Sequence, residues 1–229
     1  MSDIYECSNC AHIYRHYTGD IIEYHQMHYR NLERRDPNEI NLNGDVTPLY
    51  HEKRKETCIN RIKHISKYLN KSDICLDIGA GAGTFAYQLA PLVSDIECTE
   101  LAPCLINEIK SLEFKVYERD FLQIEFDKKY DVVFAWHVLE HINDPEKFLL
   151  KTKKISNKYV IIEVPLFAAL NGKGRQRKLK PIMYRGYFDG HAHMFCEKSF
   201  RTMAEKYFNI IELKEGIQSP ALMAIMEMK

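Results

Sequence analysis

The sequence predicts an α/β protein whose sheet is mostly parallel and covered by helices on both faces. Short apolar strands alternate with helical segments between residues 51 and 165. These strands are apolar on both faces, which is typical of a sheet buried between two helix layers. A strand also runs directly into a glycine-rich turn that opens a helix, at residues 76–84. Nucleotide-binding α/β sheets are built in this way.

The first part of the sequence is a polar segment, and a predicted helix follows it. Residues 1–50 are rich in Tyr and His and show no clean period, so we assign them to an N-terminal cap or lid. From residue 51 to residue 69 the pattern becomes helical, with Ile59, Ile62 and Ile65 on one face. We therefore place the main domain at residues 51–229, with an insert at 165–196 above the acceptor site.

The remaining elements follow in a regular order. The predicted strands are 74–78, 95–100, 114–117, 130–136 and 159–164, and the predicted helices are 84–93, 103–112, 144–156 and 197–207. Asp144 and Pro145 provide an N-cap and a proline in the first turn of their helix. The segments 210–214 and 221–228 are separated by turn residues, so we expect an antiparallel pair to close the sheet.

The composition is that of an ordinary globular protein. The 229 residues are 45% hydrophobic and 28% charged, which excludes disordered and collagen-like chains. One large domain, or one domain with a small appendage, is expected at this length. The 32 basic and 32 acidic residues cancel, so a nucleic-acid or membrane partner would need a local charged patch.

We expect neither a membrane span nor an export signal. No apolar run reaches the ~20 residues that a membrane helix needs, and the N-terminus lacks a positive flank followed by an apolar core. The seven cysteines are irregularly spaced, as is typical of reduced cytosolic thiols. The sequence therefore predicts a cytoplasmic protein with no membrane partner, and a homodimer stays open.

The glycine loop at residues 76–84 is the most informative segment. Glycines let the backbone turn tightly and approach a ligand, and the helix N-terminus offers unpaired N–H groups. The dinucleotide fingerprint needs a glycine where Thr84 stands, which disfavours a nicotinamide cofactor. The acid at the start of the loop, Asp77, suits a ligand with a positive centre and an amino group better than it suits a pyrophosphate.

Two further acids follow the next two strands. Glu100 lies 23 positions after Asp77, where its carboxylate can accept hydrogen bonds from both hydroxyls of a ribose. Asp120 can meet an adenine amino group, with Phe121 beside the ring. Both acids could instead be solvated strand ends, and the glycine loop is what favours the ligand roles.

Together these segments resemble the class I S-adenosylmethionine-dependent methyltransferases. The resemblance extends from about Cys58 to the C-terminus and rests on residues 76–85, 100, 120–121, 130–145 and 161–165. It implies a Rossmann-like, seven-stranded sheet of order 3-2-1-4-5-7-6 and S-adenosylmethionine as the cofactor. The cofactor-binding residues that it implies are Asp77, Gly79, Ala80, Gly81, Gly83, Glu100, Leu101, Asp120, Phe121, Ala135 and Trp136.

Histidines are the candidates for the acceptor site, since a hydroxyl or amide acceptor can need a base. His137 follows the fourth strand, at the edge to which the methyl group should point. His191 and His193 precede the last helix, and we take His137, His193 and His191 as candidate catalytic residues. His141 lies in a segment common to many methyltransferases and can equally hold the fold together.

Two metal sites are open alternatives, and neither is favoured. Small-RNA 2′-O-methyltransferases resemble residues 137–141 with a metal-binding Glu-x-x-Glu-His motif and a distant His. Here His137 replaces the first Glu, and His191 or His193 could supply the last ligand. Cys7 and Cys10 resemble one knuckle of a zinc ribbon, but no second Cys-x-x-Cys follows.

The insert carries five basic residues within positions 173–180. They could bind an anionic substrate or form a solvated loop. We predict methyl transfer to an oxygen or nitrogen atom of a sugar, nucleotide-linked or phosphorylated metabolite, by family analogy. The rival hypotheses are an RNA methyltransferase, disfavoured by the zero net charge, and a non-catalytic cofactor-binding partner of another methyltransferase.

Overall fold

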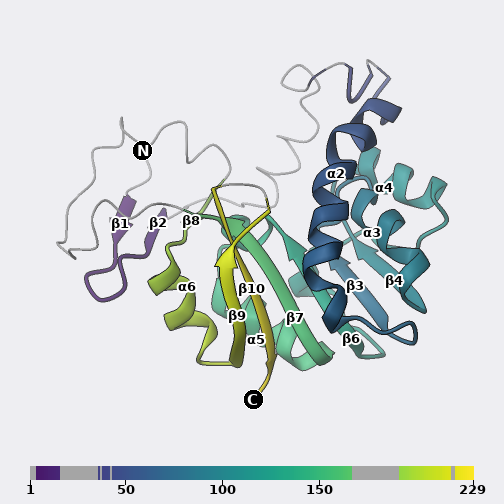
Figure 1. Cartoon of the computed structure of the whole chain (residues 1–229). Helices are drawn as coiled ribbons and strands as arrows, with labels where there is room; N and C mark the ends of the chain where they lie inside the picture. Colours follow the sequence, from purple (N-terminus) through teal and green to yellow (C-terminus); the bar gives the residue numbers. More distant parts are fainter. Residues whose placement is uncertain (1–3, 16–35, 37, 42, 167–190, 218–219) are drawn as a thin grey trace.

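The computed structural model describes residues 4–15, 36, 38–41, 43–166, 191–217 and 220–229 (Figure 1). Its main sheet contains β3 (Ile74–Ile78), β4 (Asp95–Thr99), β5 (Val116–Tyr117), β6 (Tyr130–Trp136), β7 (Ser156–Pro165), β9 (Phe208–Glu215) and β10 (Ala221–Met228). The strand order is β5-β4-β3-β6-β7-β10-β9. The first five strands are parallel, and β10 pairs antiparallel with both β7 and β9. This confirms the predicted fold class and strand order.

The helices are α2 (Pro48–Ile65), α3 (Thr84–Leu89), α4 (Pro103–Ser111), α5 (Pro145–Ile155) and α6 (Glu197–Ala204). Short 3-10 turns are η2 (Ser66–Tyr68), η3 (Ala90–Leu92), η4 (Phe121–Gln123) and η5 (Leu139–His141). The predicted helix at 84–93 ends early and continues as η3, because Pro91 has no N–H to donate and its ring crowds the preceding turn. No helix among the described residues is long and apolar enough to cross a membrane.

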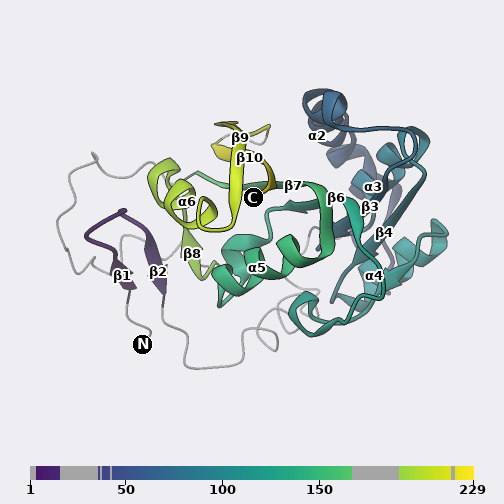
Figure 2. The ribbon, with the colours of Figure 1, turned by 90° about the horizontal axis from the view of Figure 1, so that it is seen from below.

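The sheet separates two apolar cores, and its strands alternate between them. In β6, Val132 and Phe134 pack with residues of α2 and α3, whereas Val133 and Ala135 pack with residues of α5 and α6. Figure 2 shows α2 and α5 on opposite sides of the sheet. Burial on both faces explains why this strand is apolar throughout.

A second, three-stranded sheet joins the N-terminal segment to the end of the insert. It contains β1 (Ile4–Glu6), β2 (Ile13–Arg15) and β8 (His193–Met194), all antiparallel. The sequence did not predict these strands, since they are only two or three residues long and show no usable period. The proposed boundary at residue 50 stays a prediction, although β2 and β8 pair across it.

Candidate functional site

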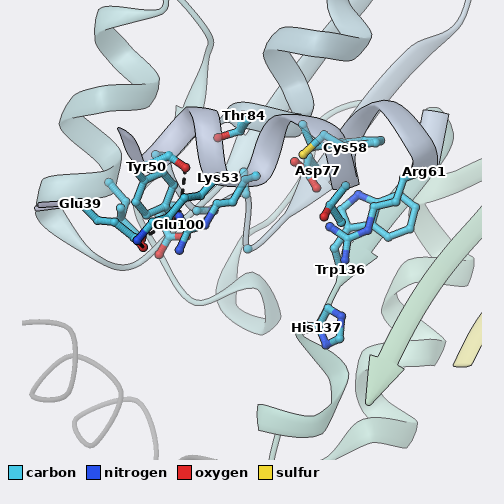
Figure 3. Close-up of a pocket in the computed structure, with 18 of the residues that line it drawn as sticks. Glu39, Tyr50, Lys53, Cys58, Arg61, Asp77, Thr84, Glu100, Trp136 and His137 are labelled. Carbon is cyan, nitrogen blue, oxygen red and sulfur yellow. Dashed lines mark hydrogen bonds and ion pairs between the residues drawn. The ribbon is translucent and has the colours of Figure 1, made fainter. Parts of the chain in front are cut away.

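A cavity of about 570 Å³ lies beside the glycine loop, between α2 and the C-terminal ends of β3, β4 and β6. Six of the predicted cofactor residues line it: Asp77, Gly79, Ala80, Gly81, Glu100 and Trp136. In Figure 3, Glu39, Tyr50, Lys53 and Glu100 form one end, and Asp77, Arg61 and Trp136 form the other, with His137 beyond Trp136. The cavity therefore runs from the glycine loop to the predicted acceptor side.

The glycine loop has a shape that side chains would prevent. Gly79 has a φ of +66°, and a Cβ placed there would lie 2.7 Å from Cγ2 of Val138. A Cβ on Gly81 would lie 3.0 Å from the Tyr50 hydroxyl, inside the cavity. Gly83 instead faces Ile109 of α4, at 3.3 Å from its would-be Cβ. It lets two helices pack closely and does not line the cavity.

Asp77 is a buried carboxyl group that faces the cavity without a hydrogen bond. It lies in β3, one residue before the strand ends, with only 1% of its surface exposed. Among the described residues, neither carboxylate oxygen has a hydrogen-bond partner. Burial raises the pKa of Asp77 to about 8, an effect that Arg61 opposes and Glu100 reinforces. A buried acid of this kind is satisfied by a cationic ligand that enters the cavity.

Glu100 is held in place by backbone amides at the other end of the loop. Its carboxylate accepts hydrogen bonds from the N–H groups of Gly81 at 2.9 Å, Leu101 at 2.7 Å and Ala102 at 3.0 Å. Leu101 thus contributes a backbone donor but does not line the cavity. These contacts fix the orientation of the carboxylate toward the glycine loop.

A buried ion pair between Arg61 and Glu163 was not predicted. Arg61 of α2 donates from Nε and Nη2 to Oε1 of Glu163 in β7, and Glu163 is fully buried. The guanidinium lies 4.6 Å over the ring of Trp136, which also contacts Phe85. The sequence held one indication: both charges stand at positions where their helix face and strand are otherwise apolar.

His137 lines the cavity and has a strained backbone. Its φ is +56°, in the left-handed region that non-glycine residues seldom adopt. Its N–H donates to the carbonyl of Glu163 at 2.8 Å, and its Nε2 lies 3.1 Å from the Glu163 carboxylate. Nδ1 lies 3.5 Å from Oε1 of Glu140. Burial lowers the pKa of His137, but the two carboxylates outweigh it and raise the value to about 9.

The other candidate histidines occupy two different places. His141 lines the cavity, and its ring packs edge-on against that of His191 with centroids 4.7 Å apart. His193 does not line this cavity. Its Nδ1 lies 2.9 Å from Nε2 of His12 in the small sheet. The structure thus brings His137, His141 and His191 toward one site and places His193 in another.

Three further predicted cofactor residues, Asp120 and Phe121 on the adenine side and Ala135, do not line the cavity. The Asp120 side chain caps η4 by accepting from the Leu122 N–H at 3.0 Å. Phe121 packs against Phe148 in the core, with ring centroids 4.9 Å apart. Ala135 is buried in β6 and packs with the core on the α5 side. Their cofactor roles stay predictions.

The cysteine pair forms a tight turn between β1 and β2. The Cys7 pKa is lowered because backbone N–H groups of Cys10 and Asn9 donate to its thiolate. Burial raises the pKa of Cys10, which Cys196 approaches closely enough to donate from Sγ to the Cys10 carbonyl at 3.5 Å. Metal binding by this pair stays a prediction, and the basic positions 173–180 lie outside the described residues.

Comparisons with known proteins agree with this architecture. The family model described as a methyltransferase domain matches residues 50–213. Ubiquinone biosynthesis O-methyltransferase from Rickettsia akari (strain Hartford) is 28% identical over 108 residues, which is 44% of this chain and 43% of that protein. The chain therefore spans less than half the length of this curated relative.

Solved methyltransferases share the fold over nearly their whole length. Magnesium protoporphyrin IX methyltransferase from Synechocystis, with bound S-adenosylhomocysteine, has a TM-score of 0.65 and 15% identity, covering 92% of this chain and all of that one (100%). An N-methyltransferase from Bradyrhizobium japonicum, also with S-adenosylhomocysteine, has a TM-score of 0.60 and 15% identity, covering 87% and 97% of the two chains.

Proposed function

We propose that this chain, which belongs to the methyltransferase domain family, transfers a methyl group from S-adenosylmethionine to a small polar acceptor. The observation that carries the proposal is the Asp77 carboxyl group, which is buried at the start of the glycine loop, faces the cavity and has no hydrogen bond to any described residue. The cavity joins this group to Glu100 on one side and to His137 on the other. That span matches a cofactor with a nucleoside at one end and an amino acid at the other.

The residues present fit this cofactor. Asp77 would accept a hydrogen bond from the ammonium group at the amino-acid end of the cofactor. Its buried carboxylate would then have a charged hydrogen-bond partner. Arg61 has five N–H donors, of which Nε and Nη2 serve Glu163, so Nη1 is left for the cofactor carboxylate. Glu100 would accept from the ribose hydroxyls. Side chains at Gly79 and Gly81 would fill the cradle that the backbone leaves between these groups.

When bound, S-adenosylmethionine supplies an electrophilic methyl group on a positively charged sulfur. The residues around the cavity would align the acceptor atom behind that methyl group, and alignment alone can supply roughly 7–11 kcal/mol of the barrier. The acceptor–carbon bond would form as the sulfur–carbon bond breaks, the electron pair would stay on sulfur, and the acceptor proton would pass to a base or to water.

His137 would orient the acceptor at this end of the cavity. Both of its ring nitrogens already face carboxylates, those of Glu163 and Glu140. A ring held on both sides is suited to fixing a geometry, and less suited to accepting a proton. His191 stands next to His141 at the same end. His193 lies with His12, so a catalytic role for it stays a prediction.

The acceptor we propose is a sugar, nucleotide-linked or phosphorylated metabolite methylated on oxygen or nitrogen. Lys53 and Arg54 line the opposite end of the cavity, beside Glu100, and both pair with Glu39, so they do not bear on the charge of the acceptor. The names of the relatives cover an O-methyltransferase and an N-methyltransferase, which fits either acceptor atom. The basic insert supports an anionic acceptor from the sequence alone.

Calorimetric titration with S-adenosylmethionine and S-adenosylhomocysteine tests the proposal. We expect wild type to bind both, Glu100→Ala to lose binding, and the exposed Glu56→Ala variant on α2 to bind like wild type. Transfer of labelled methyl groups to sugar phosphates and nucleotide sugars then identifies the acceptor. A folded wild type that binds neither ligand would overturn the proposal.

A further inference from the structure

Three metal-ligand side chains meet at the acceptor end of the cavity. Glu140 and His141 lie in η5, directly after β6, and His191 arrives from the segment before β8. One ligand atom of each residue lies within 4.8 Å of the other two. Oε1 of Glu140 is 3.8 Å from Nε2 of His141. His141 also lines the cavity, so the cluster adjoins the proposed acceptor position.

The backbone holds the two segments of this cluster together. The N–H of Ala192 donates to the carbonyl of Glu140 at 2.8 Å, between residues adjacent to His191 and His141. The N–H of His141 in turn donates to the carbonyl of Val138 at 2.9 Å. Ligands carried on a fixed backbone need little reordering when an ion binds.

The Glu140 carboxylate gives a second, independent indication of a ligand. Glu140 is 1% exposed, and among the described residues neither of its carboxylate oxygens has a hydrogen-bond partner. Buried carboxylates without hydrogen bonds are costly and rare unless an ion or water satisfies them. The imidazoles of His137 and His141 lie within ion-pair distance of it, at 3.5 Å and 3.8 Å, but neither forms a hydrogen bond to its oxygens.

We propose that Glu140, His141 and His191 bind one divalent transition-metal ion, with Zn²⁺ the best match. Two imidazoles and one carboxylate form a common catalytic zinc site, which keeps a further position open for water or substrate. With bond lengths of about 2.0–2.2 Å, tetrahedral ligand atoms lie about 3.4 Å apart. Side-chain movements of about 1 Å therefore close the cluster around the ion.

His137 is assigned to the surroundings of this site and not to its ligands. Its Nε2 is engaged by Glu163 at 3.1 Å, and Nδ1 faces the Glu140 carboxylate at 3.5 Å. It is thus placed to orient the Glu140 ligand, as outer groups commonly do around metal ions. The backbone bond from the His137 N–H to the Glu163 carbonyl fixes it there.

The inference rests on the proposed function and deepens it, because it names the group that activates the acceptor. An acceptor hydroxyl bound at the open position would lose its proton to water more readily, as metal-bound water does. Its oxygen would then form the new bond to the methyl carbon, while the sulfur–carbon bond breaks and the electron pair stays on sulfur. This predicts an oxygen acceptor.

Cobalt(II) titration of the full chain, stripped of metal by a chelator, tests the site. We expect one Co²⁺ to bind per chain, with the visible absorption of a Co²⁺ ion of low coordination number, and we expect Zn²⁺ to displace it. His191→Ala and His141→Ala should each weaken Co²⁺ binding by at least about 100-fold, since even outer-shell losses cost 10–100-fold. His64→Ala, an exposed histidine on α2, should bind like wild type.

Three outcomes separate the possibilities. Sulfur-to-cobalt charge-transfer absorption that survives in both histidine variants would assign the ion to the cysteines and overturn the inference. A wild type that binds S-adenosylmethionine in calorimetry but takes up no Co²⁺ would also overturn it, while the proposed function stands. Co²⁺ uptake lost in His191→Ala, by a protein with unchanged circular dichroism, would support the site whether or not the cofactor binds.

Discussion

Single residues decide the chemistry of the cavity. Most of them are charged residues that are buried because they belong to otherwise apolar strands or helix faces. Asp77 lies near the end of a buried strand, Glu163 lies within another, and Arg61 belongs to the apolar face of α2. Arg61 and Glu163 satisfy each other, whereas Asp77 has no hydrogen-bond partner in the part of the chain that the structure describes. The residue left without a partner is therefore the one with which a cationic ligand would interact most strongly.

Cofactor binding should release a proton from Asp77. With a pKa of about 8, the acid is about nine-tenths protonated at pH 7 in the free protein. An ammonium group beside it favours the charged form, so the pKa falls and the proton leaves. Calorimetry in two buffers of different ionisation enthalpy should show release of nearly one proton per S-adenosylmethionine at pH 7, and little release above pH 9.

The matched variants for this prediction are Asp77→Asn and the exposed Asp127→Asn. Asp77→Asn should bind more weakly and release no proton, while Asp127→Asn should behave like wild type. Equal buffer dependence in wild type and Asp77→Asn would contradict the assignment of the proton to this carboxyl group.

The elements place these residues because strands, loop and helices meet at one edge of the sheet. β3, β4 and β6 are parallel neighbours, so the segments that follow them converge at their C-terminal ends. The loop after β3 passes so close to the segment after β6 that Gly79 nearly touches Val138. The geometry of the cavity thus depends on two connections packing tightly.

Gly79→Ala should destabilise the protein through this packing. The left-handed φ alone costs about 1–2 kcal/mol in an alanine, and the crowding against Val138 adds about 1–3 kcal/mol. Gly44→Ala is the control, since Gly44 also has a positive φ of +87° but open space around its would-be Cβ. Urea unfolding should show a clearly larger loss of stability for Gly79→Ala than for Gly44→Ala.

A double-mutant cycle identifies the crowded partner. Adding Val138→Ala to Gly79→Ala should recover part of the lost free energy of unfolding, as a favourable coupling between the two sites. Strict additivity of the two substitutions would show that the contact contributes nothing.

At the scale of the whole molecule, the small sheet ties the start of the described chain to its C-terminal third. β2 pairs with β8, and His12 and His193 meet between them, both buried. Burial, aided by His193, lowers the pKa of His12 to about 3. The N-terminal attachment therefore contains a histidine that must stay neutral.

The contribution of His12 to the free energy of unfolding should fall as the pH drops below about 6.5. The unfolded chain takes up a proton on His12 near pH 6.5 while the folded chain does so only near pH 3, so stability present above pH 6.5 is lost between these values. The slope is at most about 1.4 kcal/mol per pH unit for one histidine. Urea unfolding at pH 7.5, 6.0 and 5.0 should show a shallower pH dependence in His12→Gln than in wild type.

His64→Ala serves as the control for this series, because His64 is exposed on α2 and should leave the pH dependence unchanged. A His12→Gln profile parallel to that of wild type would show that proton uptake by His12 does not differ between the folded and unfolded chain in this pH range.

The sequence by itself determined the features that neighbouring residues encode. The strands at 74–78, 130–136 and 221–228 agree with the structure residue by residue, because apolar periodicity is a property of adjacent positions. The glycine loop could be predicted because its glycines mark a turn with a backbone that other residues seldom adopt. Six of the cofactor residues implied by the resemblance do line the cavity. The strand order came from that resemblance and is confirmed.

Only the tertiary structure decided which distant residues meet. Arg61 and Glu163 are 102 positions apart, and His12 and His193 are 181 apart. Two histidines separated by one residue, His191 and His193, were equivalent in the sequence. His193 belongs to β8 and enters the small sheet, whereas His191 precedes that strand, separated from it by the bend at Ala192, and its ring packs against His141 at the cavity edge. No local pattern records which side faces the site, since that depends on how the chain returns to the sheet.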